Sequence, residues 1–190
     1  PAIWPASDVV FDTPEEAAES FVSEVLGVEP VLSDFMGGDS RSGEIQVFSP
    51  GESGAEPTDR LERGLLDLRI IGPNDGWFVI GAGGPGMTIE SPETLDLVPA
   101  GPLVVSGQGR GFEGTVVVTA YRAGDADDVL DQVITRGGVF ETLEPYSVTL
   151  DLSDGAPGDV IALIVRGDTG LDGDPGDFAS VPIVIDDPTP

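Results

Sequence analysis

Acidic side chains are the groups of this sequence with the clearest capacity for chemistry. Segment 168–177 concentrates them among glycine and proline residues, as Asp168, Asp172, Asp174 and Asp177. Such oxygens suit Ca²⁺, which needs several of them to converge on one centre. Counted from Asp168 as a calcium loop, however, Gly170 and Ala179 occupy the third and twelfth positions, where oxygen ligands are required. We therefore predict a solvated acidic loop without a metal or cofactor, and keep these four aspartates as weak metal candidates.

Carboxylates could also hydrolyse a glycosidic bond, if one of a pair has a raised pKa. The chain has 35 acidic residues, so pairs arise by chance and indicate little by themselves. The acid nearest an apolar run is Glu113, and we expect it to open a strand and pair with Arg110 or a backbone N–H. We predict that the protein is not an enzyme, and a carboxylate-based hydrolase is the third of the functions considered.

The composition excludes most other catalytic chemistry. The sequence has no cysteine and no histidine, and all eight of its basic residues are arginine. Thiol or Ser–His catalysis, imidazole- or thiolate-bound zinc and Schiff-base lysine chemistry are therefore impossible.

The net charge of −27 limits the class of partner. A polyanion repels phosphate backbones and anionic membrane surfaces, and no basic stripe offers a nucleic-acid interface. No apolar run approaches the roughly 18 residues of a membrane span. We predict an unidentified protein or cell-wall partner, no nucleic acid and no direct membrane insertion. We expect the acidity to serve solubility in an exposed compartment, with adaptation to a saline habitat as the rival explanation and recruitment of cations as the third.

One helix is predicted, over residues 13–26. It opens with a capping box, in which Thr13 caps the helix, Glu16 reaches back and Pro14 takes the first helical position. Apolar residues then recur at helical spacing, and Gly27 is expected to end the helix.

Alternating and apolar runs at 44–48, 65–71 and 77–80 predict antiparallel strands, with a hairpin turn at 73–76. A helix followed by these strands predicts an α+β domain over residues 1–86, in which Trp77 packs beneath the helix. The order is similar, as a weak fold analogy, to cystatin-like and NTF2-like units.

Residues 81–86 spell G-x-G-x-x-G, the pattern of dinucleotide-binding loops. That motif needs a helix directly after it, whereas here Pro85 interrupts the motif and a strand-like run follows. We interpret the segment as a linker and place the domain boundary there.

The second half is predicted to be all β. Strand-like runs lie at 87–90, 102–106, 115–122, 129–135, 146–152, 160–166 and 178–185. Their spacing predicts an immunoglobulin-like β-sandwich over residues 87–190. Tyr146, near the start of a strand, is expected to anchor a corner of this sandwich through its hydroxyl.

A further pattern in this half is formed by Ile89, Pro92, 102–107, 112–116, Asp172, Gly173 and 181–183. In these residues it resembles the Gmad2 domain, the immunoglobulin-like module of bacterial proteins associated with spore germination. The family usually has a serine before the late acidic-glycine pair, where this chain has the expanded loop 168–177. The resemblance implies an extracytoplasmic, envelope-associated accessory module and supplies no catalytic residues.

Together these features predict a non-enzymatic, extracytoplasmic binding or scaffolding protein of a bacterial envelope, secreted or lipid-anchored. The chain starts at Pro1 rather than Met, which suggests processing, and a leader or lipid-attachment cysteine could have been removed. The alternative is a small-ligand or glycan-binding protein that uses the N-terminal sheet. The aromatic residues that could line its site, or a peptide site, are Trp4, Trp77, Phe78, Tyr121 and Tyr146.

Overall fold

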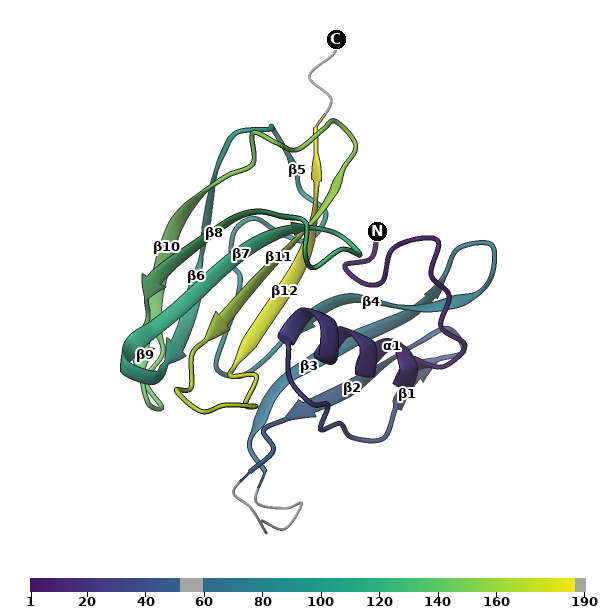
Figure 1. The fold of residues 1–190 in the computed structure, drawn as a ribbon, viewed down its shortest axis with the longest axis horizontal. Helices are drawn as coiled ribbons and strands as arrows, with labels where there is room; N and C mark the ends of the chain where they lie inside the picture. The colour runs from purple at the N-terminus through teal and green to yellow at the C-terminus, as the bar shows by residue number, and fades with distance from the viewer. Residues whose placement is uncertain (52–59, 187–190) are drawn as a thin grey trace.

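The computed structural model describes residues 1–51 and 60–186, whose strands form two β-sheets (Figure 1). The strands of the larger sheet are β1 (Met36–Asp39), β2 (Ser42–Phe48), β3 (Glu62–Ile71), β4 (Gly76–Gly83), β5 (Leu97–Val98), β7 (Thr115–Arg122), β8 (Val129–Arg136), β11 (Val160–Gly167) and β12 (Phe178–Ile185). The smaller sheet consists of β6 (Pro102–Gly111), β9 (Gly138–Val139) and β10 (Glu144–Asp151). The larger sheet has the order β1-β2-β3-β4-β12-β11-β7-β8, with β5 paired to β12, and the smaller sheet has the order β10-β6-β9.

The predicted helix is confirmed. It consists of α1 (Pro14–Phe21) and a π-helical turn, η1 (Val22–Leu26). The backbone N–H of Glu16 donates to Thr13 Oγ1 at 3.2 Å, and Glu16 Oε2 accepts from the Thr13 N–H at 3.3 Å. Gly27 ends the helix with a φ of 71°, in the left-handed region. Neither helical segment, nor any other among the described residues, is long and apolar enough to cross a membrane.

Removal of this cap gives a first prediction. Thr13→Ala is expected to lower the free energy of unfolding by about 1 kcal/mol, because one helix N–H loses its acceptor. Thermal melting followed by circular dichroism would measure the loss. Ser23→Ala, an exposed substitution within η1, is the matched control and should change stability by much less. Equal effects of the two substitutions would show that the cap contributes nothing.

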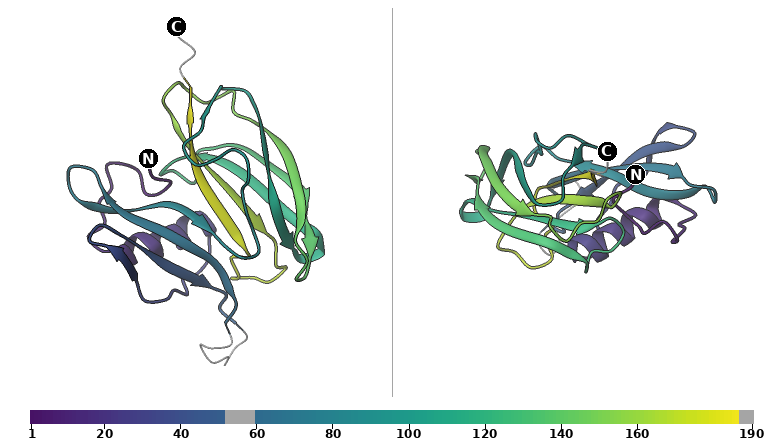
Figure 2. Two further views of the ribbon diagram at one scale, coloured as in Figure 1. Left: turned by 180° about the vertical axis from the view of Figure 1, so that it is seen from behind. Right: turned by 90° about the horizontal axis from the view of Figure 1, so that it is seen from above.

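The helix and the smaller sheet cover opposite faces of the larger sheet. Strand β11 shows this, because its side chains alternate between two hydrophobic cores. Ile161, Leu163 and Val165 belong to the core against the smaller sheet, whereas Ala162 and Ile164 belong to the core beneath α1. Seen from behind, strands β2 to β4 lie in front of the helix (Figure 2).

Two predicted side-chain roles are confirmed. Trp77 is buried in the core beneath α1, where its ring is T-shaped to that of Phe35 with centroids 5.2 Å apart. The Tyr146 hydroxyl donates to the Thr88 carbonyl at 2.7 Å and so acts as an anchor.

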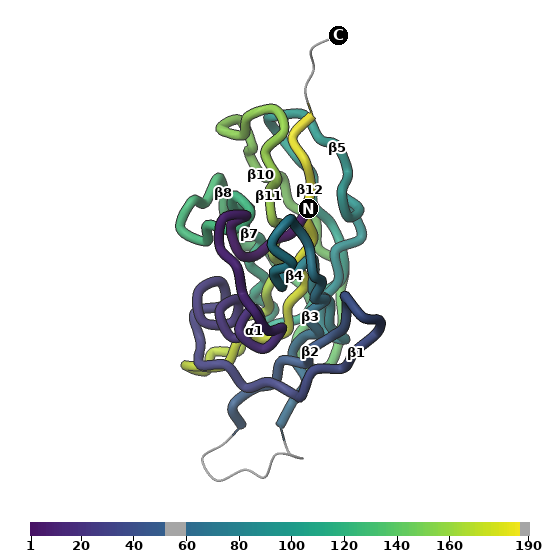
Figure 3. Tube along the Cα trace, turned by 90° about the vertical axis from the view of Figure 1, so that its right-hand side faces the viewer, coloured from purple at the N-terminus to yellow at the C-terminus, as the bar shows by residue number. Residues whose placement is uncertain are grey.

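The N-terminal arm packs beside β4 (Figure 3). The Ile3 N–H donates to the Val79 carbonyl at 2.9 Å, and Trp4 Nε1 donates to Ser20 Oγ on the helix at 3.0 Å. Trp4 therefore joins the arm to the helix.

The glycine-rich segment is not a free linker. Residues 81–83 belong to β4 and pair with β3, and Ala82 also pairs with Ser180 of β12. The larger sheet thus continues across the predicted boundary, and the core beneath α1 includes Tyr121 and Phe178 from the second half. A division into domains 1–86 and 87–190 is not shown and stays a prediction.

Over residues 87–186, the strands of the second half are interrupted by no helix other than the short 3-10 turn Phe112–Gly114. The strand-like runs from 102–106 onward coincide with β6, β7, β8, β10, β11 and β12. The run at 87–90 is not a strand, because Met87 makes only isolated bridges to Gly84 and Gly109. The two sheets face each other across a shared core, and an immunoglobulin-like identity for them stays a prediction.

Candidate functional site

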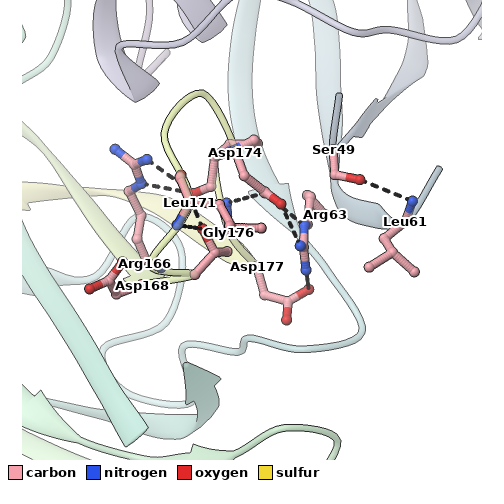
Figure 4. A network of polar contacts seen from close by, with 12 residues as sticks. Ser49, Leu61, Arg63, Arg166, Asp168, Leu171, Asp174, Gly176 and Asp177 are labelled. Atoms are coloured by element: carbon pink, nitrogen blue, oxygen red, sulfur yellow. Dashed lines mark hydrogen bonds and ion pairs between the residues drawn. The ribbon is translucent and has the colours of Figure 1, made fainter. Parts of the chain in front are cut away.

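Two arginines form ion pairs with the loop 168–177 between β11 and β12, and Figure 4 shows those of Arg63. Arg63 of β3 donates from Nε and Nη2 to both carboxylate oxygens of Asp174, at 2.9 and 2.6 Å. Arg110 of β6 donates from Nε to Asp177 Oδ2 at 2.8 Å. The side chains of Asp174 and Asp177 are 5% and 6% exposed, and that of Arg63 is 12% exposed. Breaking such buried pairs is costly, so they hold the loop firmly.

A third arginine attaches the same loop to the end of the helix. Arg166 of β11 donates from Nη1 to the Leu26 carbonyl at 3.0 Å, and from Nε and Nη2 to the Pro175 carbonyl at 3.2 and 3.0 Å. Burial lowers the pKa of the Arg166 guanidinium, and the carboxylates of Asp168 and Asp174 partly oppose this shift. The loop is therefore joined to β3, to β6 and to the helix.

The four candidate aspartates do not share one environment. Asp174 and Asp177 are buried and paired, so the prediction of a solvated loop is wrong for these two. Asp168 is exposed and accepts from the Gly170 N–H at 2.8 Å, and Asp172 is also exposed. Within residues 1–51 and 60–186, no group of three or more acidic side chains is placed to hold a metal ion.

Glu113 does not have the predicted role. It lies in the turn before β7 with a left-handed φ of 53°, and its side chain is exposed. Arg110, its expected partner, pairs with Asp177 instead. The prediction of a Glu113–Arg110 pair is therefore wrong.

The glycine-rich segment packs directly against the ion pairs. A Cβ at Gly86 would lie 2.2 Å from Asp177 Cγ, and one at Gly84 would lie 2.7 Å from the Arg63 carbonyl oxygen. A Cβ at Gly83 would meet nothing within 4 Å. No helix follows the segment, so it lacks the structure of a dinucleotide loop. Its glycines at 84 and 86 instead allow close approach of the backbone to the arginine and aspartate.

On one side of the loop lies a cleft of about 290 Å³, which we call the aromatic cleft. Arg63, Arg110 and Asp177 line its buried part. Its exposed apolar rim consists of Leu61, Phe112, Phe140 and Leu171.

The rim is unusual because large apolar side chains face solvent. Phe140 is 84% exposed, and the other three rim residues are each more than half exposed. Phe140 also has a φ of 53°, which is uncommon for a bulky residue. Sequence reasoning missed this rim. The available signal was Phe140 itself, an aromatic residue placed after Gly137 and Gly138 in a turn, where no strand could bury it.

The aromatic residues predicted to line a site lie elsewhere. Trp77, Phe78, Tyr121 and Tyr146 are all buried and none lines the aromatic cleft. Of the aromatic candidates in the N-terminal half for a glycan site, Trp77 and Phe78 are buried, and Trp4 is half-buried and bonded to the helix. That alternative therefore has no fully exposed aromatic at these three positions.

A second cavity, of about 320 Å³, lies on the other side of the loop, bordered by Val25 of η1 and by β7, β8 and β11. Tyr121 lines it, and its hydroxyl is buried without a hydrogen-bond partner among the described residues. Burial raises the pKa of this hydroxyl, because the charged form is disfavoured away from water. A buried donor without an acceptor destabilises the folded state.

This orphaned hydroxyl gives a second prediction. Tyr121→Phe is expected to raise the free energy of unfolding by about 1 kcal/mol, because the desolvation penalty disappears with the oxygen. Tyr146→Phe is the matched control and is expected to lose about 1 kcal/mol, because its hydroxyl has an acceptor. Urea denaturation of both variants would test this. A loss at Tyr121 as large as that at Tyr146 would contradict it.

The chain was compared with models of known protein families, with curated proteins and with solved structures, and none of the three comparisons found a match.

Proposed function

We propose that this is a non-enzymatic binding or scaffolding protein that holds its partner at the aromatic cleft. The observation that carries the proposal is the exposed apolar rim. Contiguous apolar side chains at a cleft are typical of interaction sites, whereas scattered single ones are not. Phe140 in particular exposes most of an aromatic side chain to water, at a cost that binding of a partner would remove.

The surroundings of the rim support a binding role. Phe112 directly follows β6, which is held by the ion pair of Arg110 with the buried Asp177. Leu171 lies in the loop, which is held by the ion pair of its Asp174 with Arg63. A rigid base reduces the conformational entropy lost when a partner binds. These two rim residues are thus preorganised for contact.

The two buried aspartates beside the cleft favour binding over catalysis. Asp174 has both carboxylate oxygens bonded to Arg63, and Asp177 has its Oδ2 bonded to Arg110, so both aspartates serve to position the loop. Arg63 has two of its guanidinium nitrogens bonded to Asp174, and its third lies 3.9 Å from Asp177 Oδ1. Such an arrangement positions the loop and activates no nucleophile.

The proposal includes an extracytoplasmic location at the envelope of a bacterium, which rests on the resemblance of the second half to the Gmad2 domain. Fractionation of bacteria that express the full-length gene, followed by immunoblotting, would test it. Recovery only in the cytoplasmic fraction would contradict this part of the proposal.

Selection of binding peptides would test the cleft itself. Phage-displayed random peptides would be selected on the immobilised protein, and the enriched peptides then assayed against two variants. Phe112→Ser/Phe140→Ser removes the aromatic rim, and Ile134→Ser removes an equally exposed apolar residue on β8 as the control. We expect the enriched peptides to bind the wild type and the Ile134 variant, and to lose binding to the rim variant. Undiminished binding to the rim variant would refute the proposal.

A further inference from the structure

We propose that the aromatic cleft binds a positively charged peptide segment, in which arginine or lysine side chains are interspersed with apolar ones. The inference rests on the proposed function and specifies the chemistry of the partner. Four features of the cleft support it, namely its exposed carboxylates, an unpaired buried acceptor, its aromatic rings and the charge of the whole chain.

The two arginines of the cleft do not make it an anion site. Arg63 and Arg110 are paired with Asp174 and Asp177, so their charges are compensated. The other charged groups that line the cleft are carboxylates, Glu141 and Asp168. Both are exposed, and neither forms an ion pair with a described residue. The balance of charge at the cleft is therefore negative.

Asp177, which lines the cleft, also has an unused acceptor beneath the surface. Asp177 Oδ1 is buried and accepts no hydrogen bond from a described residue. The nearest cationic nitrogen, Arg63 Nη1, lies 3.9 Å away, beyond hydrogen-bond distance. A buried carboxylate oxygen gains most from a charged donor. A guanidinium or ammonium group supplies such a donor, and a carboxylate ligand does not.

The rim suits a cation with an apolar stem. Phe112 and Phe140 expose ring surface, and ring faces attract ammonium and guanidinium groups through their quadrupoles. Leu61 and Leu171 offer aliphatic surface beside them, against which the methylene groups of lysine or arginine and neighbouring apolar residues would pack.

The whole chain favours the same class of partner. With a net charge of −27, the protein attracts cationic segments over a distance and repels acidic ones. Because this attraction is general, the test must separate binding at the cleft from adsorption to any acidic surface.

The probes are three acetylated and amidated hexapeptides that alternate leucine with arginine, with citrulline or with glutamate. Citrulline keeps the shape of arginine without its charge. Dissociation constants would be measured by isothermal titration calorimetry at low and at physiological salt. The variants are Glu141→Gln/Asp168→Asn, Phe140→Ala and, as a control with the same change of charge, Glu19→Gln/Glu29→Gln. Asparagine at 168 can still accept the bond from Gly170.

We expect the arginine peptide to bind at least about tenfold more tightly than the citrulline peptide, and the glutamate peptide not to bind. The cleft charge variant and Phe140→Ala should each weaken the arginine peptide by about fivefold, against less than about twofold for the control.

Three outcomes would overturn the inference. Equal binding of the arginine and citrulline peptides, with loss in Phe140→Ala, would refute the cationic partner but leave the binding function of the cleft intact. Tighter binding of the glutamate peptide would show that the cleft prefers an acidic partner, contrary to the inference. Equal weakening by the cleft and control charge variants, with no effect of Phe140→Ala, would show general adsorption and would also count against the proposed function.

Discussion

Arg63→Ala is expected to lower the free energy of unfolding by about 3–5 kcal/mol, the usual cost of removing one partner from a buried ion pair. Without the guanidinium, the Asp174 carboxylate loses two short hydrogen bonds while only 5% of its side chain remains exposed. The loop would then lose its connection to β3. Urea denaturation followed by tryptophan fluorescence would measure the change.

Two comparisons make this result specific. Arg41→Ala breaks an ion pair to Asp75 that is exposed on both sides, and should change stability little. The double variant Arg63→Ala/Asp174→Ala should be less unstable than the sum of its single variants, because no buried charge is left without a partner. If Arg63→Ala cost no more than Arg41→Ala, the network would not hold the loop as described.

Gly86→Ala is expected to destabilise the protein by about 1–3 kcal/mol through overpacking alone, and by more if an ion pair breaks. The new methyl group would lie 2.2 Å from Asp177 Cγ and must displace that carboxylate from Arg110. Thermal melting would give the magnitude.

Gly83→Ala is the matched control, since it lies in the same glycine-rich segment but has open space around its Cβ. It should be close to neutral. If both substitutions were tolerated equally, the segment would not be closely packed, and the interpretation of it as a linker would stand. A large loss at Gly86 alone would establish that the glycine is required by the aspartate behind it.

Structural features that depend on residues close together in the sequence could be predicted. The cap at Thr13, the helix end at Gly27 and the turn at 73–76 each depend on residues within one helical turn or hairpin, and all three are observed. The strands after residue 102 were also predictable, because β-branched and apolar runs alternate with glycine-rich turns.

The order of the strands could not be predicted in the same way. Strand β12 pairs with β4 and β11, and no local pattern indicates that a strand from one half will adjoin a strand from the other. Glycines at 81 and 83 resembled a linker because glycine is typical of turns. Here they lie within β4, and those at 84 and 86 serve close packing.

The candidate site shows the same limit. The acidic loop was evident from its composition, but its arginines were not, since Arg63 is 111 positions from Asp174 along the chain. The order of the strands brings the arginines and the loop together. As a result Asp174 and Asp177 belong to a buried network of ion pairs, whereas the sequence predicted that they would be solvated. Phe112 and Phe140 likewise meet at one cleft only through the packing of β6 and β9.

The central place of β12 has a consequence for synthesis. Among the described strands it comes last along the chain, yet it lies in the middle of the larger sheet. A ribosome therefore makes β4 well before the strand that joins it to β11, and β11 shortly before. Until residues 178–185 emerge, both strands present an unpaired edge, and such edges readily pair with other chains. The nascent protein is thus exposed to aggregation through these two edges until β12 is complete.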